Sequence, residues 1–142
     1  MKLFLDANVI FSAAHREHGR SQDLVALARA GLCELLASAH ALEEARRNLE
    51  LKSAGFERRL DQALAQTVVV AEAPAALVEW AQAQGLPLKD APILAAAVHA
   101  QADLLVTGDS RDFGHLYGRK LRGTRVVTPA VALDLVLKGA GA

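Results

Sequence analysis

Residues 102–113 read ADLLVTGDSRDF, and this stretch carries the clearest structural signal in the chain. Its apolar run, residues 104–107, has the length and composition of a buried strand. Gly108 follows and allows a tight turn. Asp109 and, three residues later, Asp112 then come after the carboxyl end of the predicted strand. The stretch therefore predicts a buried strand that delivers carboxylates to one edge of a sheet.

The rest of the chain repeats this alternation of short strands and helices. Further strands are predicted at residues 3–5, 33–37, 67–70 and 125–128. The spacing of apolar residues predicts helices at 9–14, 22–30, 39–51, 56–65, 74–85, 91–102 and 129–137. Alternation from end to end predicts an α/β domain, in which helices cover both faces of a mostly parallel sheet.

Polar residues and glycines mark several predicted helix ends. Ser21 and Ser38 directly precede helical patterns and can cap them. Gly31 follows one pattern and ends it. The tail, residues 139–142, lies beyond the last pattern and is expected to be frayed.

Size and composition indicate one globular domain that spans residues 1–142. A chain of 142 residues, 52% hydrophobic and 23% charged, can bury a core without disulfides. Its one cysteine, Cys33, cannot form an intramolecular disulfide, which fits a reducing compartment. We find no signal peptide and no membrane-spanning run, so we expect a cytoplasmic protein. The formal net charge of zero argues against a broad basic face that coats nucleic acid.

Four acidic residues are expected at the edge of the sheet where ligands bind in open α/β folds. Asp6 ends the first strand, and Asp109 follows the strand described above. Asp90 heads the helix that leads into that strand, and Glu44 lies in the second turn of the helix after the second strand. Asp112 is a fifth candidate. Each also has a purely structural interpretation, as a strand end, helix cap, solvated helix residue or turn residue, and spacing alone does not show that they converge.

A convergent set of carboxylates points to a hard metal ion. Carboxylates brought together repel one another and stay ionised only when a cation joins them. No Cys or His cluster favours a softer metal, so Mg²⁺ or Mn²⁺ is expected. His15 and His18 are three residues apart, but we interpret them as surface residues or phosphate contacts. A hard cation lowers the pKa of bound water and clamps a phosphate oxygen, which is the chemistry of phosphodiester hydrolysis.

Four segments that carry these acidic residues resemble the motifs of the PIN-domain family, which includes the VapC-type toxins of toxin–antitoxin pairs. In chain order they are LDANV at 5–9, SAHALEE at 38–44, KDAPILAAA at 89–97 and ADLLVTGDSRDF at 102–113. The fourth is the most specific. Their order and spacing also agree with the family, and the resemblance covers nearly the whole chain.

The resemblance implies a three-layer α/β/α fold with a mostly parallel sheet of about five strands, and a metal-dependent endoribonuclease. The implied catalytic and metal-binding residues are Asp6, Glu44, Asp90 and Asp109, with Asp112 as a supplementary ligand. Asn8 and Thr107 would orient those ligands. Glu43 is a rival for Glu44, because only one of two adjacent side chains can face the pocket. One metal ion or two is left open.

The resemblance also implies an RNA substrate, an antitoxin partner and a homodimer, and the choice of RNA over DNA rests on it alone. RNA requires positive charge near the acidic pocket. We expect phosphate contacts from Arg111 in the fourth motif and from the basic run Arg119, Lys120, Arg122 and Arg125. Arg16 and Arg20, after the first motif, are interpreted as solvated surface charges.

Two other classes of function remain open on the sequence. A non-catalytic PIN-like module that binds RNA or protein would be favoured by the loss of an acidic position, and none is lost. A phosphatase on a related α/β fold would need an aspartate at Asn8, and a phospho-acceptor domain would need an acidic pair at Asp6 and a lysine at Thr128. The endoribonuclease, as the toxin of a toxin–antitoxin pair, is therefore the leading hypothesis.

Overall fold

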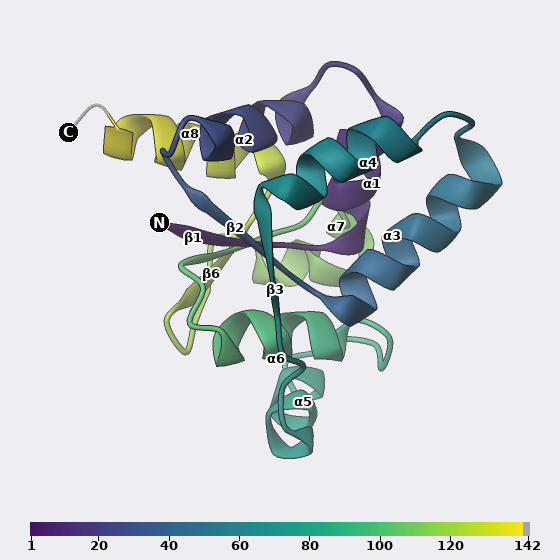
Figure 1. Ribbon diagram of the computed structural model, residues 1–142. Coiled ribbons are helices and arrows are strands. Elements are labelled where there is room, and N and C mark those ends of the chain that lie inside the picture. The colour runs from purple at the N-terminus through teal and green to yellow at the C-terminus, as the bar shows by residue number, and fades with distance from the viewer. Residues whose placement is uncertain (141–142) are drawn as a thin grey trace.

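Six strands form one sheet, in the order β3-β2-β1-β4-β6-β5, in the computed structural model, which describes residues 1–140 (Figure 1). They are β1 (Lys2–Leu5), β2 (Glu34–Ser38), β3 (Thr67–Val70), β4 (Leu104–Val106), β5 (Lys120–Leu121) and β6 (Thr124–Val127). Neighbouring strands are parallel except β5, which is antiparallel to β6. The five predicted parallel strands are confirmed. β5 was not predicted, because a strand of 2 residues has no periodicity to detect.

Helices cover both faces of the sheet, as predicted. They are α1 (Ala7–His15), α2 (Arg20–Arg29), α3 (Ala39–Lys52), α4 (Glu57–Ala65), α5 (Ala75–Gln82), α6 (Ala91–His99), α7 (Ser110–Phe113) and α8 (Pro129–Ala140), with a 3₁₀ turn η1 (Gly114–Leu116). In Figure 1, α1, α2, α4 and α8 lie above the sheet, and α5 and α6 lie below it. Within residues 1–140, no helix combines the length and hydrophobicity that a bilayer span requires.

The core lies between the central strands and the helices on either side. Phe4 of β1 and Leu105 of β4 are fully buried, as expected for strands covered on both faces. Ala95, Ala96 and Ala97 of α6 are also fully buried, and such small side chains let α6 lie close to the sheet. This packing fixes the central strands whose carboxyl ends carry the acidic residues.

Two predicted helix starts have different outcomes. Ser38 caps α3, because its Oγ accepts a hydrogen bond from the N–H of Ala41 at 3.2 Å. The predicted cap at Ser21 is wrong, since α2 already begins at Arg20 and Ser21 is buried within its first turn. The N-cap position belongs to Gly19, whose φ of 136° is accessible to glycine but strained for other residues.

The last helix is longer than predicted. α8 continues through Ala140, so residues 139 and 140 of the predicted frayed tail are helical. A glycine such as Gly139 weakens a helix by only about 1 kcal/mol relative to alanine, which does not stop it. The remaining two residues of that prediction, 141 and 142, lie outside the described residues.

Candidate active site

The acidic residues meet at the carboxyl edge of the sheet. Asp6 directly follows β1, and the loop that carries Asp109 follows β4, its parallel neighbour. Asp90 stands at the start of α6, and Glu44 projects from α3, which follows β2. These residues line a pocket of about 220 Å³, the acidic pocket, whose other polar lining residues are Asn8, Asn48, Lys52 and Lys89.

Asp6 is held through both of its carboxylate oxygens. It is 3% exposed, and its Oδ1 accepts from the N–H of Ala7 at 2.7 Å, which caps α1. Its Oδ2 accepts from Thr107 Oγ1 at 2.8 Å and from Asn8 Nδ2 at 3.0 Å. Burial raises the pKa of Asp6, the hydrogen bonds from Thr107 and Ala7 oppose this rise, and the charge of Glu44 adds to it. Asn8 and Thr107 thus orient the Asp6 carboxylate.

The loop after β4 is fixed by the same polar side chains. Asn8 Oδ1 accepts from the N–H of Gly108 at 2.7 Å, and Thr107 Oγ1 accepts from the N–H of Asp109 at 3.1 Å. A Cβ at Gly108 would lie 3.3 Å from Asn8 Oδ1, so a glycine allows this close approach. Tyr117 donates its O–H to the carbonyl of Thr107 at 2.8 Å. These contacts hold Asp109 at the wall of the acidic pocket.

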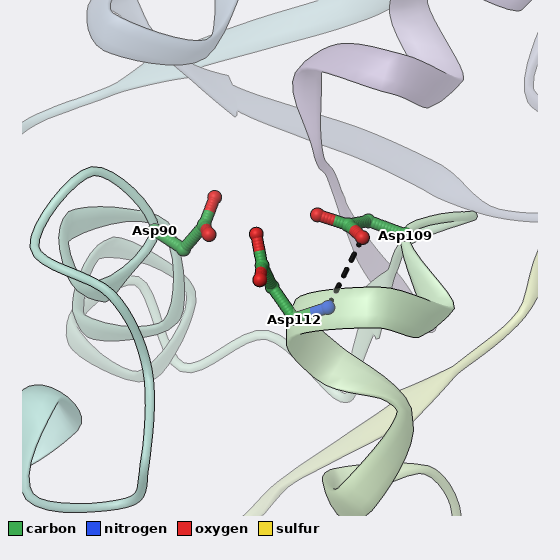
Figure 2. A group of neighbouring side chains, drawn as sticks. All are labelled: Asp90, Asp109 and Asp112. Atoms are coloured by element: carbon green, nitrogen blue, oxygen red, sulfur yellow. Dashed lines mark hydrogen bonds between the residues drawn. The ribbon is translucent and has the colours of Figure 1, made fainter.

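Three carboxylates come close enough to share one cation (Figure 2). Asp90, Asp109 and Asp112 each offer one oxygen to a group whose members lie within 4.8 Å of one another. Asp109 also caps α7, because its Oδ1 accepts from the N–H of Asp112 at 3.1 Å. Asp6 and Glu44 line the same pocket but are not members of this close group. The five residues predicted as ligands are therefore not equivalent.

Asp90 is poorly satisfied by the protein itself. It is 7% exposed and occupies the N-cap position of α6, yet its side chain makes no capping hydrogen bond. Its Oδ2 is buried and has no hydrogen-bond partner among residues 1–140. A buried carboxylate oxygen without a partner is costly. A divalent cation would satisfy it, so the residues present fit Mg²⁺ or Mn²⁺, which bind carboxylate oxygens.

The pKa of Asp90 reflects the same unfavourable burial of its carboxylate. Burial raises the pKa of Asp90 to about 7, and its hydrogen bond with Asp112 adds to the rise, while the charge of Lys89 opposes it. That hydrogen bond lowers the pKa of Asp112. Asp90 therefore takes up a proton more readily than an isolated carboxyl, and Asp112 less readily, as expected for acidic groups forced together. The positive charge of a bound cation can replace this proton.

Glu44, and not Glu43, faces the acidic pocket. Glu44 is half-buried and lines the pocket together with Asn48 and Lys52, which lie one and two turns further along α3. Glu43 is exposed and pairs with Arg47 at 3.2 Å. Residues four apart share a helix face, so the spacing from Glu44 could have predicted Asn48 and Lys52.

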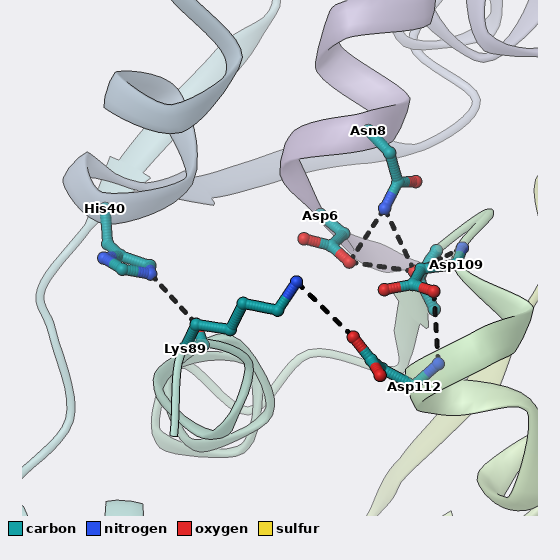
Figure 3. A network of polar contacts seen from close by, with 7 residues as sticks. Asp6, Asn8, His40, Lys89, Asp109 and Asp112 are labelled. Carbon is teal, nitrogen blue, oxygen red and sulfur yellow. Dashed lines mark hydrogen bonds and ion pairs between the residues drawn. The ribbon is translucent and has the colours of Figure 1, made fainter. Parts of the chain in front are cut away.

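Lys89 is a further pocket residue that its sequence context did not single out (Figure 3). Its Nζ lies 3.6 Å from Asp112 Oδ2, and its side chain is 68% exposed. The charges of Asp90 and Asp112 raise its pKa. His40 Nε2 donates to the carbonyl oxygen of Lys89 at 3.2 Å, which ties the segment carrying Asp90 to the start of α3. The position of Lys89 directly before Asp90 was the sequence signal that could have identified it as a pocket residue.

Most of the basic run after the fourth motif lies away from the acidic pocket. β6 runs parallel to β4, with Arg125 opposite Leu104, the first residue of β4. Lys120 pairs with Arg125 in the antiparallel β5. Both residues therefore lie at the amino edge of the sheet, whereas the carboxylates lie at the carboxyl edge. The β5–β6 hairpin therefore carries Lys120 to the edge opposite the acidic pocket, and its contact with RNA stays a prediction.

The remaining basic residues of that prediction are distributed over different surfaces. Arg122, in the turn between β5 and β6, lies over the ring of Trp80 at 4.4 Å, and its contact with RNA stays a prediction. Arg119 lies beside β6, where its carbonyl oxygen accepts from the N–H of Val126. Arg111 is exposed on α7, next to Asp112, and its contact with RNA stays a prediction.

This fold and this site define a class of protein: an α/β domain with a pocket of carboxylates at the carboxyl edge of its central strands. A family model described as PIN domain matches residues 2–111. The chain belongs to the PIN-domain family. No curated protein is similar enough in sequence to count as a significant match.

Solved structures share the fold at low sequence identity. VapBC2 from Rickettsia felis, bound to a DNA fragment from their promoter, has a TM-score of 0.63 and 16% identity, over 90% of this chain and 98% of that chain. PAE2754 from Pyrobaculum aerophilum has a TM-score of 0.63 and 18% identity, over 100% and 97%. VapC20 from Mycobacterium tuberculosis, described as a Sarcin-Ricin loop cleaving toxin, has a TM-score of 0.54 and 16% identity, over 77% and 91%.

Proposed function

We propose that this protein is a Mg²⁺- or Mn²⁺-dependent endoribonuclease that hydrolyses phosphodiester bonds in RNA. The observation that carries the proposal is the buried Oδ2 of Asp90, which has no hydrogen-bond partner among residues 1–140; Asp90 lies in a close group with Asp109 and Asp112. A site that leaves a carboxylate oxygen without a partner is suited to a cation. The description of VapC20 as a Sarcin-Ricin loop cleaving toxin supports RNA as the substrate.

The residues of the acidic pocket divide the chemistry among them. Asp90, Asp109 and Asp112 would hold the cation. When bound, a divalent cation lowers the pKa of a water molecule and neutralises charge on a phosphate. Asp6 keeps lone pairs free at the pocket wall, because its three hydrogen bonds leave part of the capacity of a carboxylate unused. Lys89 Nζ, beside Asp112, can donate to a phosphate oxygen and offset the charge that develops in the transition state.

We further propose that the protein is the toxin of a toxin–antitoxin pair, that an antitoxin protein blocks the acidic pocket, and that the protein is a cytoplasmic homodimer. Support for the partner comes from the shared fold with VapBC2 and from the motifs that resemble VapC-type toxins. Copurification of the tagged chain with a product of a neighbouring gene, and loss of cleavage when that product is added, would establish the pair.

The test of the nuclease is cleavage of a mixed pool of structured RNA by the purified protein in Mg²⁺, in Mn²⁺ and in EDTA. We expect cutting that needs the metal and disappears in Asp90→Asn. Asp61→Asn is the matched control, because Asp61 is an exposed carboxylate on α4 that does not line the acidic pocket. A folded wild-type protein that cuts no RNA in either metal would instead favour a binding module.

A further inference from the structure

We propose that a second hollow, at the same edge of the sheet as the acidic pocket, binds a backbone phosphate of the RNA strand away from the bond that is cut. This inference rests on the proposed function, since it states how the substrate is held. The hollow has a volume of about 520 Å³, and we call it the basic hollow. The residues that define it are Ser12, Arg16, His18, Arg20, Ser21 and Thr128.

No ion pair among residues 1–140 neutralises the positive charge in the basic hollow. Arg16 and Arg20 are exposed, and the ion pairs formed within residues 1–140 all join other side chains. Glu17 and Asp23, the carboxylates closest to them in sequence, are exposed and do not line the hollow. His18 adds a third basic side chain to the lining. An anion that enters the hollow therefore meets cationic groups that are free to bind it.

The first turn of α2 adds hydrogen-bond donors. Its N-cap, Gly19, has no side chain, so no side chain at the N-cap accepts from the N–H groups of the first turn. Ser21 is 8% exposed and lines the hollow. Its hydroxyl is a group that can donate to an oxygen of a bound anion. A phosphate oxygen suits both groups, because helix N-termini favour anions.

A second helix start faces the same hollow. Thr128 Oγ1 accepts from the N–H of Val131 at 3.2 Å and caps α8, while Pro129 has no N–H to satisfy. Thr128, Pro129 and Ala130 all line the hollow. The N-terminal ends of α2 and α8 thus converge on one space, and their partial positive charges add to those of the arginines.

The basic hollow lies next to the acidic pocket. The N–H of Thr107 donates to the carbonyl of Val127 at 3.0 Å, so the start of α8 adjoins the loop that carries Asp109. Along α1, Ser12 in the hollow lies four residues beyond Asn8 in the pocket. Four helical residues span about 6 Å, roughly two stacked nucleotides at ~3.4 Å each. One RNA strand can therefore occupy both sites.

RNA fits this hollow better than an acidic protein segment does. The acidic pocket repels a polyanion, so a substrate that enters it has to be held by positive groups at the same edge. Lys120 and Arg125 lie at the other edge and do not serve this purpose. The hollow instead offers cations and N–H and O–H donors to a phosphate, and its lining residue Ser12 lies about one helical turn from Asn8 in the pocket.

The test measures binding of a short fluorescein-labelled single-stranded RNA by anisotropy in EDTA, at several salt concentrations. The double variant Arg16→Gln/Arg20→Gln should raise Kd about tenfold and reduce the slope of log K against log salt by about 0.7, the value for one phosphate on a single strand. Ser21→Ala should raise Kd by a smaller factor. Arg29→Gln is the matched control, because Arg29 lies at the far end of the same helix and outside the hollow, and it should change Kd less than twofold.

Amide NMR shifts give a second readout. Titration with the same RNA should move the N–H signals of the first turn of α2 in the wild type and not in the double variant. Unchanged Kd and slope in the double variant would overturn the inference, and the proposed function would survive if the wild type still cuts RNA in Mg²⁺. Loss of binding in the double variant, together with no cutting by the wild type, would support RNA binding at the basic hollow and refute the proposed nuclease activity. Signals that move with a polyglutamate peptide and not with RNA would assign the hollow to an acidic protein partner and overturn the inference.

Discussion

Replacement of Asp90 by asparagine should stabilise the metal-free protein while it removes metal binding. Burial raises the pKa of Asp90 to about 7, whereas the carboxyl of an unfolded chain titrates near 3.8. The folded protein therefore binds one more proton than the unfolded chain between these two pH values. The free energy of unfolding then falls as the pH rises through this window. At pH 8 Asp90 is ionised, and the full destabilisation caused by its buried charge is present. The side-chain amide introduced by Asp90→Asn would carry no charge and could donate a hydrogen bond to Asp112.

The size of this effect follows from the same pKa. A difference of about 3 units corresponds to roughly 4 kcal/mol, at 1.36 kcal/mol per unit. The lowered pKa of Asp112 works in the opposite direction and Lys89 screens the pair, so we expect a net gain of about 1–2 kcal/mol for Asp90→Asn at pH 8. For a chain of this length, that gain corresponds to a rise in Tm of about 3–6 °C.

Thermal unfolding in EDTA at pH 8 and at pH 5 tests this reasoning. The variant should unfold at a higher temperature than the wild type at pH 8, and the difference should shrink at pH 5. Addition of Mg²⁺ should raise the Tm of the wild type and leave that of the variant unchanged, because only a protein that binds the ion is stabilised by it. A variant less stable than the wild type at pH 8 in EDTA would refute the argument, since Asp90 would then make favourable contacts that the structure does not contain.

Three further changes test the support of the site. Thr107→Val removes the hydroxyl that donates to Asp6 and should lower the free energy of unfolding by about 1–2 kcal/mol, as measured by urea denaturation. Asp6→Asn should also lower the free energy of unfolding, by about 1–3 kcal/mol. The new side-chain NH₂ group would either face the donors Asn8 and Thr107 or leave the N–H of Ala7 unpaired. Equal stability of variant and wild type in urea denaturation would contradict this. Glu44→Gln should weaken Mn²⁺ binding about tenfold in titration calorimetry, whereas Glu43→Gln should not. Equal losses of Mn²⁺ affinity in the two variants would show that the pocket does not distinguish Glu44 from Glu43.

The central strands and the acidic residues that follow them could be predicted because both depend on local pattern. β1 and β4 are buried on both faces, so they stand out as apolar runs, and the first polar residue after each run marks the carboxyl edge of the sheet. Parallel neighbours place these residues side by side. Asp6 and Asp109 were therefore accessible to sequence reasoning, whereas the separation of Asp6 and Glu44 from the close group of three depends on side-chain positions that spacing does not encode.

Features that depend on short or reversed segments could not be predicted. β5 has only two residues, so the sequence does not reveal it. When β5 is not predicted, the basic run, which closely follows Asp109 and Asp112 in sequence, is expected to lie close to them in space as well. The hairpin carries Lys120 to the opposite edge instead. In the same way, Ser21 has the composition of a helix cap, but glycine at position 19 allows α2 to begin earlier, which leaves the Ser21 hydroxyl inside the basic hollow.

The net charge of zero conceals a separation of charge along α1. Asp6 caps the N-terminal end of this helix at the acidic pocket, and Arg16 stands at its C-terminal end in the basic hollow. A helix dipole favours a negative group at its N-terminus and a positive group at its C-terminus, by about 0.3–1 kcal/mol each. The arrangement that would hold RNA across both sites therefore also stabilises α1. Exchange of the two charges would weaken the helix and the binding surface together, so stability and the proposed function favour the same distribution of charge.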